Sequence, residues 1–232
     1  MSTWSEKILE YMEALDYTNL KIPNHVGLMN PFAESENIRK INKSFYQKYY
    51  ADHHERRAII GINPGRLGAG ATGIPFTDTK RLKQFCDIDP GEVSTHEPSS
   101  VFIYDMINAH SNPKEFYQHF YITSAFPLGF TTISNNGKEI NYNYYDDKVL
   151  QDIVTPFILN HLIAQIDFGL NTDVAFCLGT GKNYKFLNAL NKKEKLFKNI
   201  IPLEHPRYIM QYKLKQKEFY IEDYINKLSF SY

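Results

Sequence analysis

A glycine-rich stretch from Gly61 to Phe76 constrains this chain more than any other feature. It follows the apolar run 58–60, and β-branched residues that pass straight into Gly and Pro are typical of a buried strand ending in a loop. Its five glycines let the backbone approach a ligand closely, and its two prolines fix the path. Open α/β sheets bind ligands at the carboxyl ends of their strands, so we expect a binding site here. An ordinary connecting loop is the alternative.

The same stretch contains the spacing of a dinucleotide-binding motif, Gly68-Ala-Gly70-Ala-Thr-Gly73. In that motif a helix runs on past the third glycine. Here Ile74-Pro75 follows at once, and proline disfavours helical geometry at the residue before it. The next helix signal is Thr77 or Asp78 as an N-cap. The sequence therefore argues against a dinucleotide site.

Length and composition predict one α/β domain over residues 1–232, because 232 residues with 43% hydrophobic content suffice for a single sizeable core. No apolar run is long enough to span a bilayer, and the N-terminus lacks the apolar segment of a signal peptide. Cys86 and Cys177 form neither a metal motif nor a disulfide framework, as is typical of a reducing compartment. We expect a cytoplasmic monomer that does not associate with membranes.

The net charge is zero, but it is unevenly distributed. Residues 181–217 contain ten Lys and Arg against two Glu. Such a basic segment on a neutral protein indicates a surface that faces a polyanion. A solvated, Lys-rich helix face is the alternative.

Apolar spacing predicts amphipathic helices over residues 3–15, 34–50 and 215–228, with irregular chain over 17–32. Residues 100–104 are either a strand or the start of a helix, and the continuing apolar pattern favours a helix. Residues 146–170 are expected to form a long helix interrupted near Pro156.

Strand-forming residues 121–123 precede Pro127 and Gly129, which places Ser124 near a carboxyl edge. A Ser that merely ends a strand is the alternative. Shortly after, Asn135-Asn-Gly137 predicts a hairpin turn between 131–133 and 139–140.

A strand over 173–178 is followed by Gly179-Thr-Gly-Lys182 and a helix over 183–190. The P-loop pattern fails, because it requires Gly at Phe176 and Ser or Thr at Asn183. What remains is a helix N-terminus whose N–H groups can bind a phosphate, or a plain strand-to-helix turn.

The last expected strand, 198–203, leads into Glu204-His-Pro-Arg207. A lone His is more often structural than catalytic. His205 lies at a strand end, beside a proline and inside the basic segment, so we expect it to be functional.

Five short motifs, taken together, resemble the uracil-DNA glycosylase superfamily, and its single-strand-selective monofunctional group most closely. They occur in the family's order over about residues 57–213: Gly61-Ile-Asn-Pro-Gly65, Thr72-Gly-Ile-Pro-Phe76, Phe126-Pro-Leu-Gly-Phe130, Leu178-Gly-Thr-Gly-Lys182 and His205-Pro-Arg207. The resemblance implies a three-layer α/β/α fold with a central four-stranded, mostly parallel sheet.

The implied reaction is hydrolysis of the N-glycosidic bond between a damaged base and deoxyribose in DNA, the first step of base excision repair. Such enzymes extrude the target nucleotide from the stack. Asn63 matches the family's water-positioning residue. His205 matches the residue that donates a hydrogen bond to the oxyanion developing on the base. The resemblance implies neither a metal nor a cofactor.

Other positions carry over to base and DNA binding. Phe76 matches the aromatic residue that stacks on the extruded base, and groups around Ile62 and Gly65 line the pocket. Where the family reads the pyrimidine edge with Asn, this chain has Ser124, whose single hydroxyl cannot make an amide's two-point contact. We therefore expect a permissive pocket that accepts deaminated purines, xanthine and hypoxanthine, as well as uracil.

The segment after His205 lacks the family's second proline. The residues that can wedge into the space left by the extruded base are Arg207, Tyr208, Ile209 and Met210. Lys182 and the lysines from Lys192 to Lys217, Lys213 among them, are expected to hold DNA phosphates.

Two other functions stay open: a DNA-binding protein of the same fold without catalysis, and a glycosidase that acts on free nucleosides. The presence of Asn63 and His205 argues against the first, and the basic segment against the second. We expect a monofunctional enzyme, because no Lys can be placed in the pocket as a Schiff-base nucleophile.

Overall fold

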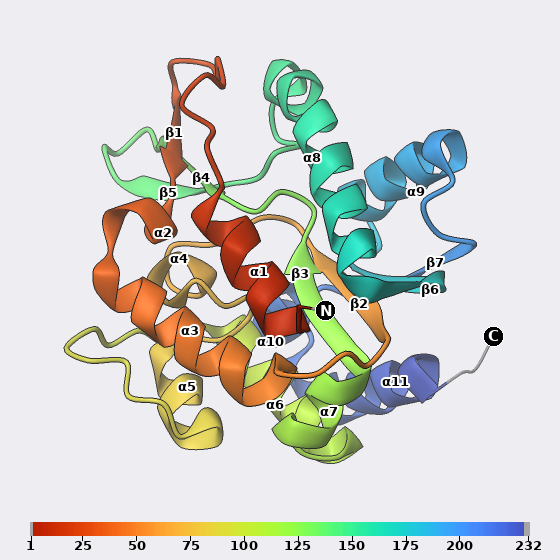
Figure 1. Ribbon diagram of the computed structural model, residues 1–232. Helices are drawn as coiled ribbons and strands as arrows, with labels where there is room; N and C mark the ends of the chain where they lie inside the picture. The colour runs from red at the N-terminus through yellow and green to blue at the C-terminus, as the bar shows by residue number, and fades with distance from the viewer. Residues whose placement is uncertain (1, 230–232) are drawn as a thin grey trace.

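The computed structural model describes residues 2–229 and contains a central parallel sheet with strand order β3-β2-β6-β7 (Figure 1). Every neighbouring pair is parallel, and the register aligns Gly61 with Ser124 and Leu178 with Leu203. The carboxyl ends of all the strands therefore share one edge. The strands are β2 (Arg56–Gly61), β3 (Phe120–Ser124), β6 (Leu170–Leu178) and β7 (Asn199–Leu203).

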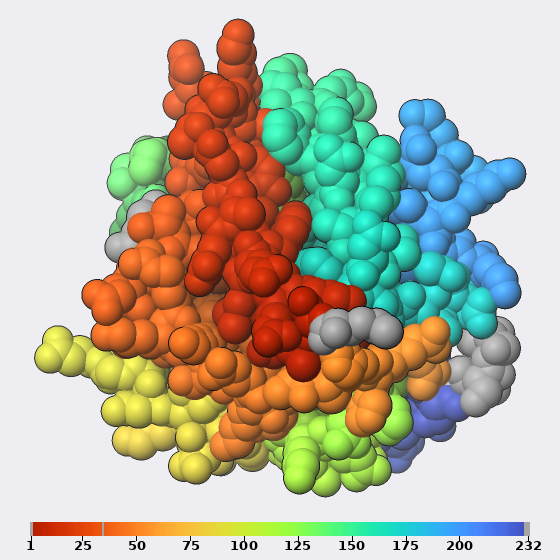
Figure 2. All heavy atoms as spheres, in the orientation of Figure 1, coloured from red at the N-terminus to blue at the C-terminus, as the bar shows by residue number. Residues whose placement is uncertain are grey.

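Helices cover both faces of this sheet, which confirms the expected α/β fold (Figure 1). One face carries α1 (Trp4–Glu13), α8 (Lys148–Gly169) and α9 (Lys182–Glu194). In the space-filling view the atoms of α1, α3 and α8 together cover this side of the molecule (Figure 2). The remaining helices are α2 (Pro31–Glu34), α3 (Glu36–Tyr50), α4 (Ala69–Thr72), α5 (Thr79–Cys86), α6 (Pro98–His110), α7 (Pro113–His119), α10 (Pro206–Tyr212) and α11 (Lys217–Ser229), with a 3₁₀ turn at Leu214–Gln216.

Most of the helices expected from the sequence are present. Thr3 caps α1 in a capping box with Glu6, and Asp78 caps α5. Residues 100–104 lie within α6, as the apolar pattern favoured. The helix expected from residue 34 is divided at Ser35, which caps α3.

A second, antiparallel sheet has the order β1-β4-β5. The predicted hairpin is confirmed as β4 (Gly129–Ile133) and β5 (Glu139–Tyr142), with Ile133 opposite Glu139. Residues 17–32 are not wholly irregular, because β1 (Val26–Met29) pairs with β4. A four-residue strand has little local signal, and here the partner strand about a hundred residues away specifies it.

The helix expected over 146–170 is continuous as α8, with Pro156 inside it. Leu150, Val154 and Ile158 are wholly buried, and this packing outweighs the one backbone hydrogen bond that proline cannot donate. Contrary to the expectation of no such run, α8 is long and apolar enough to cross a membrane by length and composition alone. A helix that packs on the core of a soluble protein passes the same test.

Candidate active site

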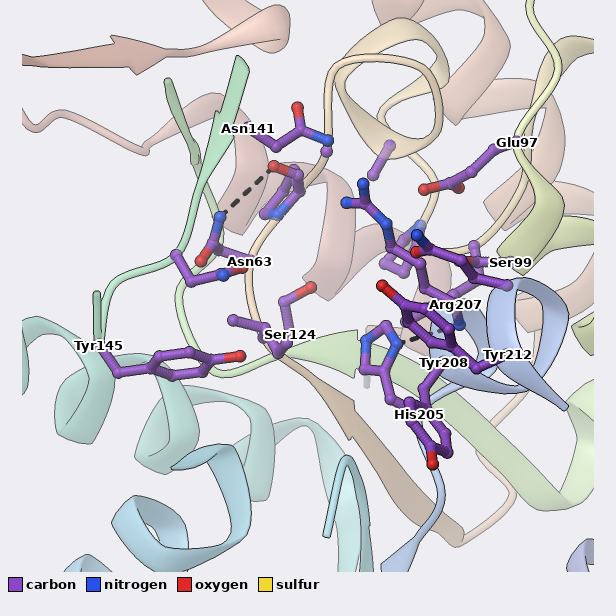
Figure 3. Close-up of a pocket in the computed structure, with 18 residues that line it drawn as sticks. Asn63, Glu97, Ser99, Ser124, Asn141, Tyr145, His205, Arg207, Tyr208 and Tyr212 are labelled. Carbon is purple, nitrogen blue, oxygen red and sulfur yellow. Dashed lines mark hydrogen bonds between the residues drawn. The ribbon is translucent and has the colours of Figure 1, made fainter. Parts of the chain in front are cut away.

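A cavity of about 290 Å³ lies at the carboxyl edge of the parallel sheet (Figure 3). Its walls come from the loop after β2, the last residue of β3, the start of α6, the end of the β4–β5 hairpin, and the segment after β7 that continues into α10. Eight of the residues named from the sequence line it: Ile62, Asn63, Gly65, Phe76, Ser124, His205, Arg207 and Tyr208. The other lining residues are Pro64, Ala69, Pro75, Glu97, Ser99, Asn141, Asn143, Tyr145, Gln211 and Tyr212.

The glycine-rich stretch folds back on itself after β2. The Gly65 carbonyl accepts hydrogen bonds from the N–H groups of Gly68 and Gly70, and the single turn α4 ends at Gly73 with φ +72°. No helix runs on from Gly73, so the argument against a dinucleotide motif is confirmed. The Thr72 hydroxyl donates to the Thr77 carbonyl at 2.6 Å and closes the loop.

The Asn63 side chain is held in one orientation by the end of the hairpin. Its Nδ2 donates to the Tyr142 carbonyl at 3.0 Å, and its Oδ1 accepts from the Tyr144 N–H at 3.1 Å. These two bonds fix which end of the amide is oxygen. Because a carbonyl oxygen has two lone pairs, Oδ1 can accept one more hydrogen bond, such as that of a water molecule.

His205 is a neutral imidazole with a defined tautomer. It caps α10, and its Nδ1 accepts the Arg207 N–H at 3.1 Å, so the ring proton lies on Nε2. Burial, and then the charge of Arg207, lowers the pKa of His205 to about 4. At neutral pH this residue therefore offers a hydrogen-bond donor without a positive charge.

The Phe76 ring packs on the end of β2 beside His205, with ring centroids 5.9 Å apart. Its φ is +53°, a left-handed conformation that non-glycine residues rarely adopt. Such strain persists only where the surrounding structure enforces it, and it is concentrated at functional sites. The ring therefore forms a fixed wall of the cavity.

Asn183, at the start of α9, has a structural role that the sequence pattern did not indicate. Its buried amide donates to the carbonyls of Leu178 at 3.0 Å and Gly61 at 3.3 Å, and it accepts the Tyr144 hydroxyl at 2.7 Å. It thus joins the ends of β2 and β6 to the segment that orients Asn63. The only sequence signal for this residue was that Asn occupies the position where a P-loop has Ser or Thr.

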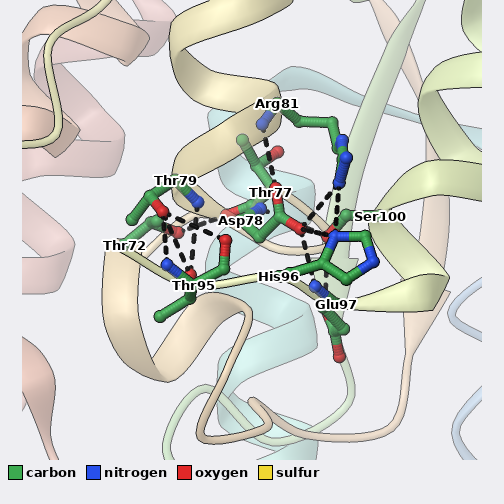
Figure 4. A network of polar contacts seen from close by, with 9 residues as sticks. All are labelled: Thr72, Thr77, Asp78, Thr79, Arg81, Thr95, His96, Glu97 and Ser100. Carbon is green, nitrogen blue, oxygen red and sulfur yellow. Dashed lines mark hydrogen bonds and ion pairs between the residues drawn. The ribbon is translucent and has the colours of Figure 1, made fainter. Parts of the chain in front are cut away.

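Glu97 was also not anticipated, and a network around the wholly buried Asp78 brings it to the cavity (Figure 4). The Asp78 carboxylate accepts the Glu97 N–H at 2.6 Å and pairs with Arg81 at 3.1 Å. Burial raises the pKa of Glu97, partly offset by the Ser100 hydroxyl and by Arg207. The Glu97 carboxyl therefore lines the cavity close to the guanidinium of Arg207.

Helix α10 forms the mouth of the cavity. It places two of the four predicted wedge residues at the cavity and turns the other two away from it. Arg207 and Tyr208 line the cavity, whereas Ile209 is 0% exposed and Met210 packs against the core. The expectation that Ile209 can wedge into DNA is therefore wrong, because helical geometry turns it inward. Met210 does not line the cavity either.

The basic segment does not form one surface. Lys182, at the start of α9, lies 3.7 Å from Asp146 near the carboxyl edge. From there α9 runs back along the sheet for about 20 Å, at 1.5 Å per residue, and carries Lys192 to Lys195 away from the cavity. Lys198 pairs with Asp173, near the start of β6. Lys192 to Lys195 and Lys198 therefore lie away from the cavity, and their contact with DNA phosphates stays a prediction.

Lys213, which directly follows α10, does not line the cavity. Over residues 2–229, no group of three or more His, Cys, Asp or Glu is arranged to hold a metal ion.

Comparison with known proteins agrees with the fold. A family model described as "uracil DNA glycosylase superfamily" matches residues 47–229 of this chain. No curated protein matches the chain. The crystal structure of wild-type Pedobacter heparinus SMUG2 is similar, with 52% sequence identity, a TM-score of 0.95, and coverage of 98% of this chain and 97% of that one. This chain belongs to the uracil DNA glycosylase superfamily.

Proposed function

We propose that the protein is a monofunctional DNA glycosylase that removes uracil, and also the deaminated purines hypoxanthine and xanthine, from DNA in base excision repair. The observation that carries the proposal is the pairing of Asn63 and His205 across one cavity, each with its hydrogen-bonding state fixed by neighbouring backbone. Membership of the superfamily supports the same reaction.

The reaction separates charge, since the sugar becomes positive as the bond breaks and the base leaves as an anion. His205 Nε2–H is placed to donate to that anion, and removing such a donor from an active site typically costs about 3–4 kcal/mol of transition-state stabilisation. A neutral imidazole can act as this donor. Another enzyme works in the same way, with a catalytic histidine that a helix N-terminus keeps uncharged.

Asn63 holds the water that attacks the sugar. Its Nδ2 is engaged by the Tyr142 carbonyl, and the free lone pair of Oδ1 accepts one water proton. An amide is not a strong base, so this role fits a reaction in which the bond is largely broken before the water attacks. Phe76 supplies a stacking surface for the extruded base.

Two observations support the finer parts of the proposal. No lysine of the described chain lines the cavity, in keeping with direct hydrolysis rather than a Schiff base. Ser124 lies at the end of β3 where the family has Asn, in keeping with a wider choice of base. Arg207 and Tyr208 at the mouth are the residues that would contact the DNA.

The test is an incubation without added metal, using single-stranded and duplex oligonucleotides that carry one uracil, hypoxanthine or xanthine, followed by alkaline cleavage. We expect strand breaks with the wild type that disappear in Asn63→Ala and His205→Ala. Asn136→Ala in the hairpin turn and His54→Ala on the surface are matched controls that should cleave normally.

Two results would contradict the proposal. Tight, salt-sensitive DNA binding without any cleavage would indicate a DNA-binding member of the fold. Turnover of free deoxyuridine as fast as that of the oligonucleotide would indicate a nucleoside glycosidase.

A further inference from the structure

Two hydroxyl groups line the cavity without a hydrogen-bond partner among residues 2–229. One belongs to Ser124, which lies at the end of β3 and is 6% exposed. The other belongs to Tyr145, just beyond β5. Tyr145 is half-buried, and because the protein engages neither hydroxyl, both are available to a ligand with matching polar atoms that enters the cavity.

Tyr145 is held rigidly in its place. The preceding residue, Tyr144, donates its N–H to Asn63, and the two tyrosine rings meet edge to face with centroids 5.0 Å apart. Lys182 Nζ lies 5.6 Å from the centroid of the Tyr145 ring. Figure 3 shows the ring entering the cavity from the side opposite His205, with its hydroxyl directed toward Ser124.

Both hydroxyls are protonated at neutral pH. Burial, followed by the negative charge of Asp146, raises the pKa of Tyr145 well above its ordinary value. Each hydroxyl provides one donor and two lone pairs, and its hydrogen rotates to suit the partner. The pair can therefore donate to one ligand atom while it accepts from the next.

Deaminated bases present this combination of atoms. Uracil, hypoxanthine and xanthine all carry a carbonyl beside a ring N–H on the edge used for base pairing. A single amide reads such an edge at one fixed spacing, whereas two separate hydroxyls that rotate independently tolerate a pyrimidine and a purine.

We propose that Tyr145 is a specificity-determining residue and that its hydroxyl, together with that of Ser124, reads the carbonyl and N–H edge of the extruded base. One hydroxyl donates to the base carbonyl and the other accepts from the adjacent N–H. This assignment rests on the proposed glycosylase function. The end of β3 and the segment after β5 together supply the two-point contact that Ser124 cannot make alone.

The test is Tyr145→Phe, which removes only the hydroxyl and keeps the ring that packs on Tyr144 and Lys182. Single-turnover cleavage rates and dissociation constants would be measured on uracil, hypoxanthine and xanthine oligonucleotides, with melting temperature as a check of folding. We expect a loss of about ten- to a hundredfold in the ratio of rate to dissociation constant on the lesions that the wild type cleaves. Ser124→Ala should show a similar loss, and Tyr220→Phe on α11 is the matched control.

A second measurement separates reading of the base from a structural role. Binding to an oligonucleotide with an abasic site, which has no base to read, should be unchanged in Tyr145→Phe. Wild-type rates on every cleaved lesion would overturn the assignment while leaving the glycosylase function in place. An equal loss of affinity for abasic DNA would also overturn it. A wild type that cleaves no lesion would overturn the proposed function and this assignment together.

Discussion

The Phe76 ring occupies the space beside Gly61 that a side chain would otherwise fill. A Cβ added to Gly61 would lie 2.9 Å from Phe76 Cε2 and 3.2 Å from the Thr123 carbonyl oxygen. The last residue of β2 is therefore glycine so that an aromatic ring can pack against the strand end, next to His205. The left-handed φ of Phe76 is part of the same arrangement.

Gly61→Ala should displace the Phe76 ring and lower the single-turnover rate by about tenfold or more, because base stacking on an aromatic side chain is worth about 1–3 kcal/mol. The check is a double-mutant cycle with Phe76→Ala, measured on a uracil oligonucleotide. If Gly61→Ala acts through the ring, it should reduce the rate little further in the Phe76→Ala background. Additive losses in the cycle would show that the alanine disturbs the site by another route.

The pH dependence should reflect the neutral state of His205. Because burial and the charge of Arg207 lower the pKa of His205 to about 4, the neutral ring is fully present above the ordinary value near 6.5 and is lost only as the pH falls through about 4. The imidazolium that then forms keeps its Nε2–H, but its Nδ1 can no longer accept the Arg207 N–H that orients the ring. The stability that His205 contributes to the fold changes with pH in the same direction. It is fully present above the pKa of the unfolded state and is lost as the pH falls through the pKa of the folded state. Single-turnover rates between about pH 3.5 and 8 would measure this limb, with circular dichroism to detect acid unfolding.

Arg207→Ala provides the control for that profile. It keeps the backbone N–H that bonds to His205 Nδ1 and removes only the charge, so the tautomer should not change. The acid limb should move upward but stay below the ordinary histidine value, because burial is the larger cause of the shift. A limb near pH 6.5 in the wild type would mean that His205 is not held neutral.

The anchoring of Asn63 predicts that Asn63→Asp is more damaging to stability than Asn63→Ala. An ionised carboxylate cannot donate to the Tyr142 carbonyl, which would then face a second acceptor at about the distance of the present hydrogen bond. A buried group left without its partner costs about 1–3 kcal/mol. Urea unfolding of both variants at neutral pH would measure the difference, and a loss no larger in Asn63→Asp than in Asn63→Ala would show that a carboxylate facing the Tyr142 carbonyl carries no added cost.

Several site residues could be predicted from the sequence because local signals placed them at strand ends. Asn63 and His205 follow strands and Ser124 ends one, and parallel strands bring their carboxyl ends to one edge. Tyr145 had no such signal. It reaches the cavity because the preceding hairpin is bound to Asn63, about eighty residues earlier, and no local pattern encodes that pairing.

The errors near the C-terminus have a different cause. His205 as the cap and Pro206 at the first helical position mark the start of a helix, but the four wedge candidates were named without assigning a helix to this segment. Helical spacing would have turned Ile209 inward and left Arg207 and Tyr208 at the surface. Likewise, charge counted along residues 181–217 took no account of α9 running away from the cavity.

Asn183 should contribute more to stability than its one-residue signal in the sequence suggests. Asn183→Ala removes bonds to the Gly61 and Leu178 carbonyls and strands the Tyr144 hydroxyl, so we expect the free energy of unfolding to fall by about 3 kcal/mol. Tyr144→Phe, which loses only its bond to Asn183, should cost about 1 kcal/mol and keep the backbone N–H that orients Asn63. Activity should therefore fall in Asn183→Ala and change little in Tyr144→Phe. Equal losses of stability in the two variants, measured by urea unfolding, would show that the bonds to the strand ends do not stabilise the fold.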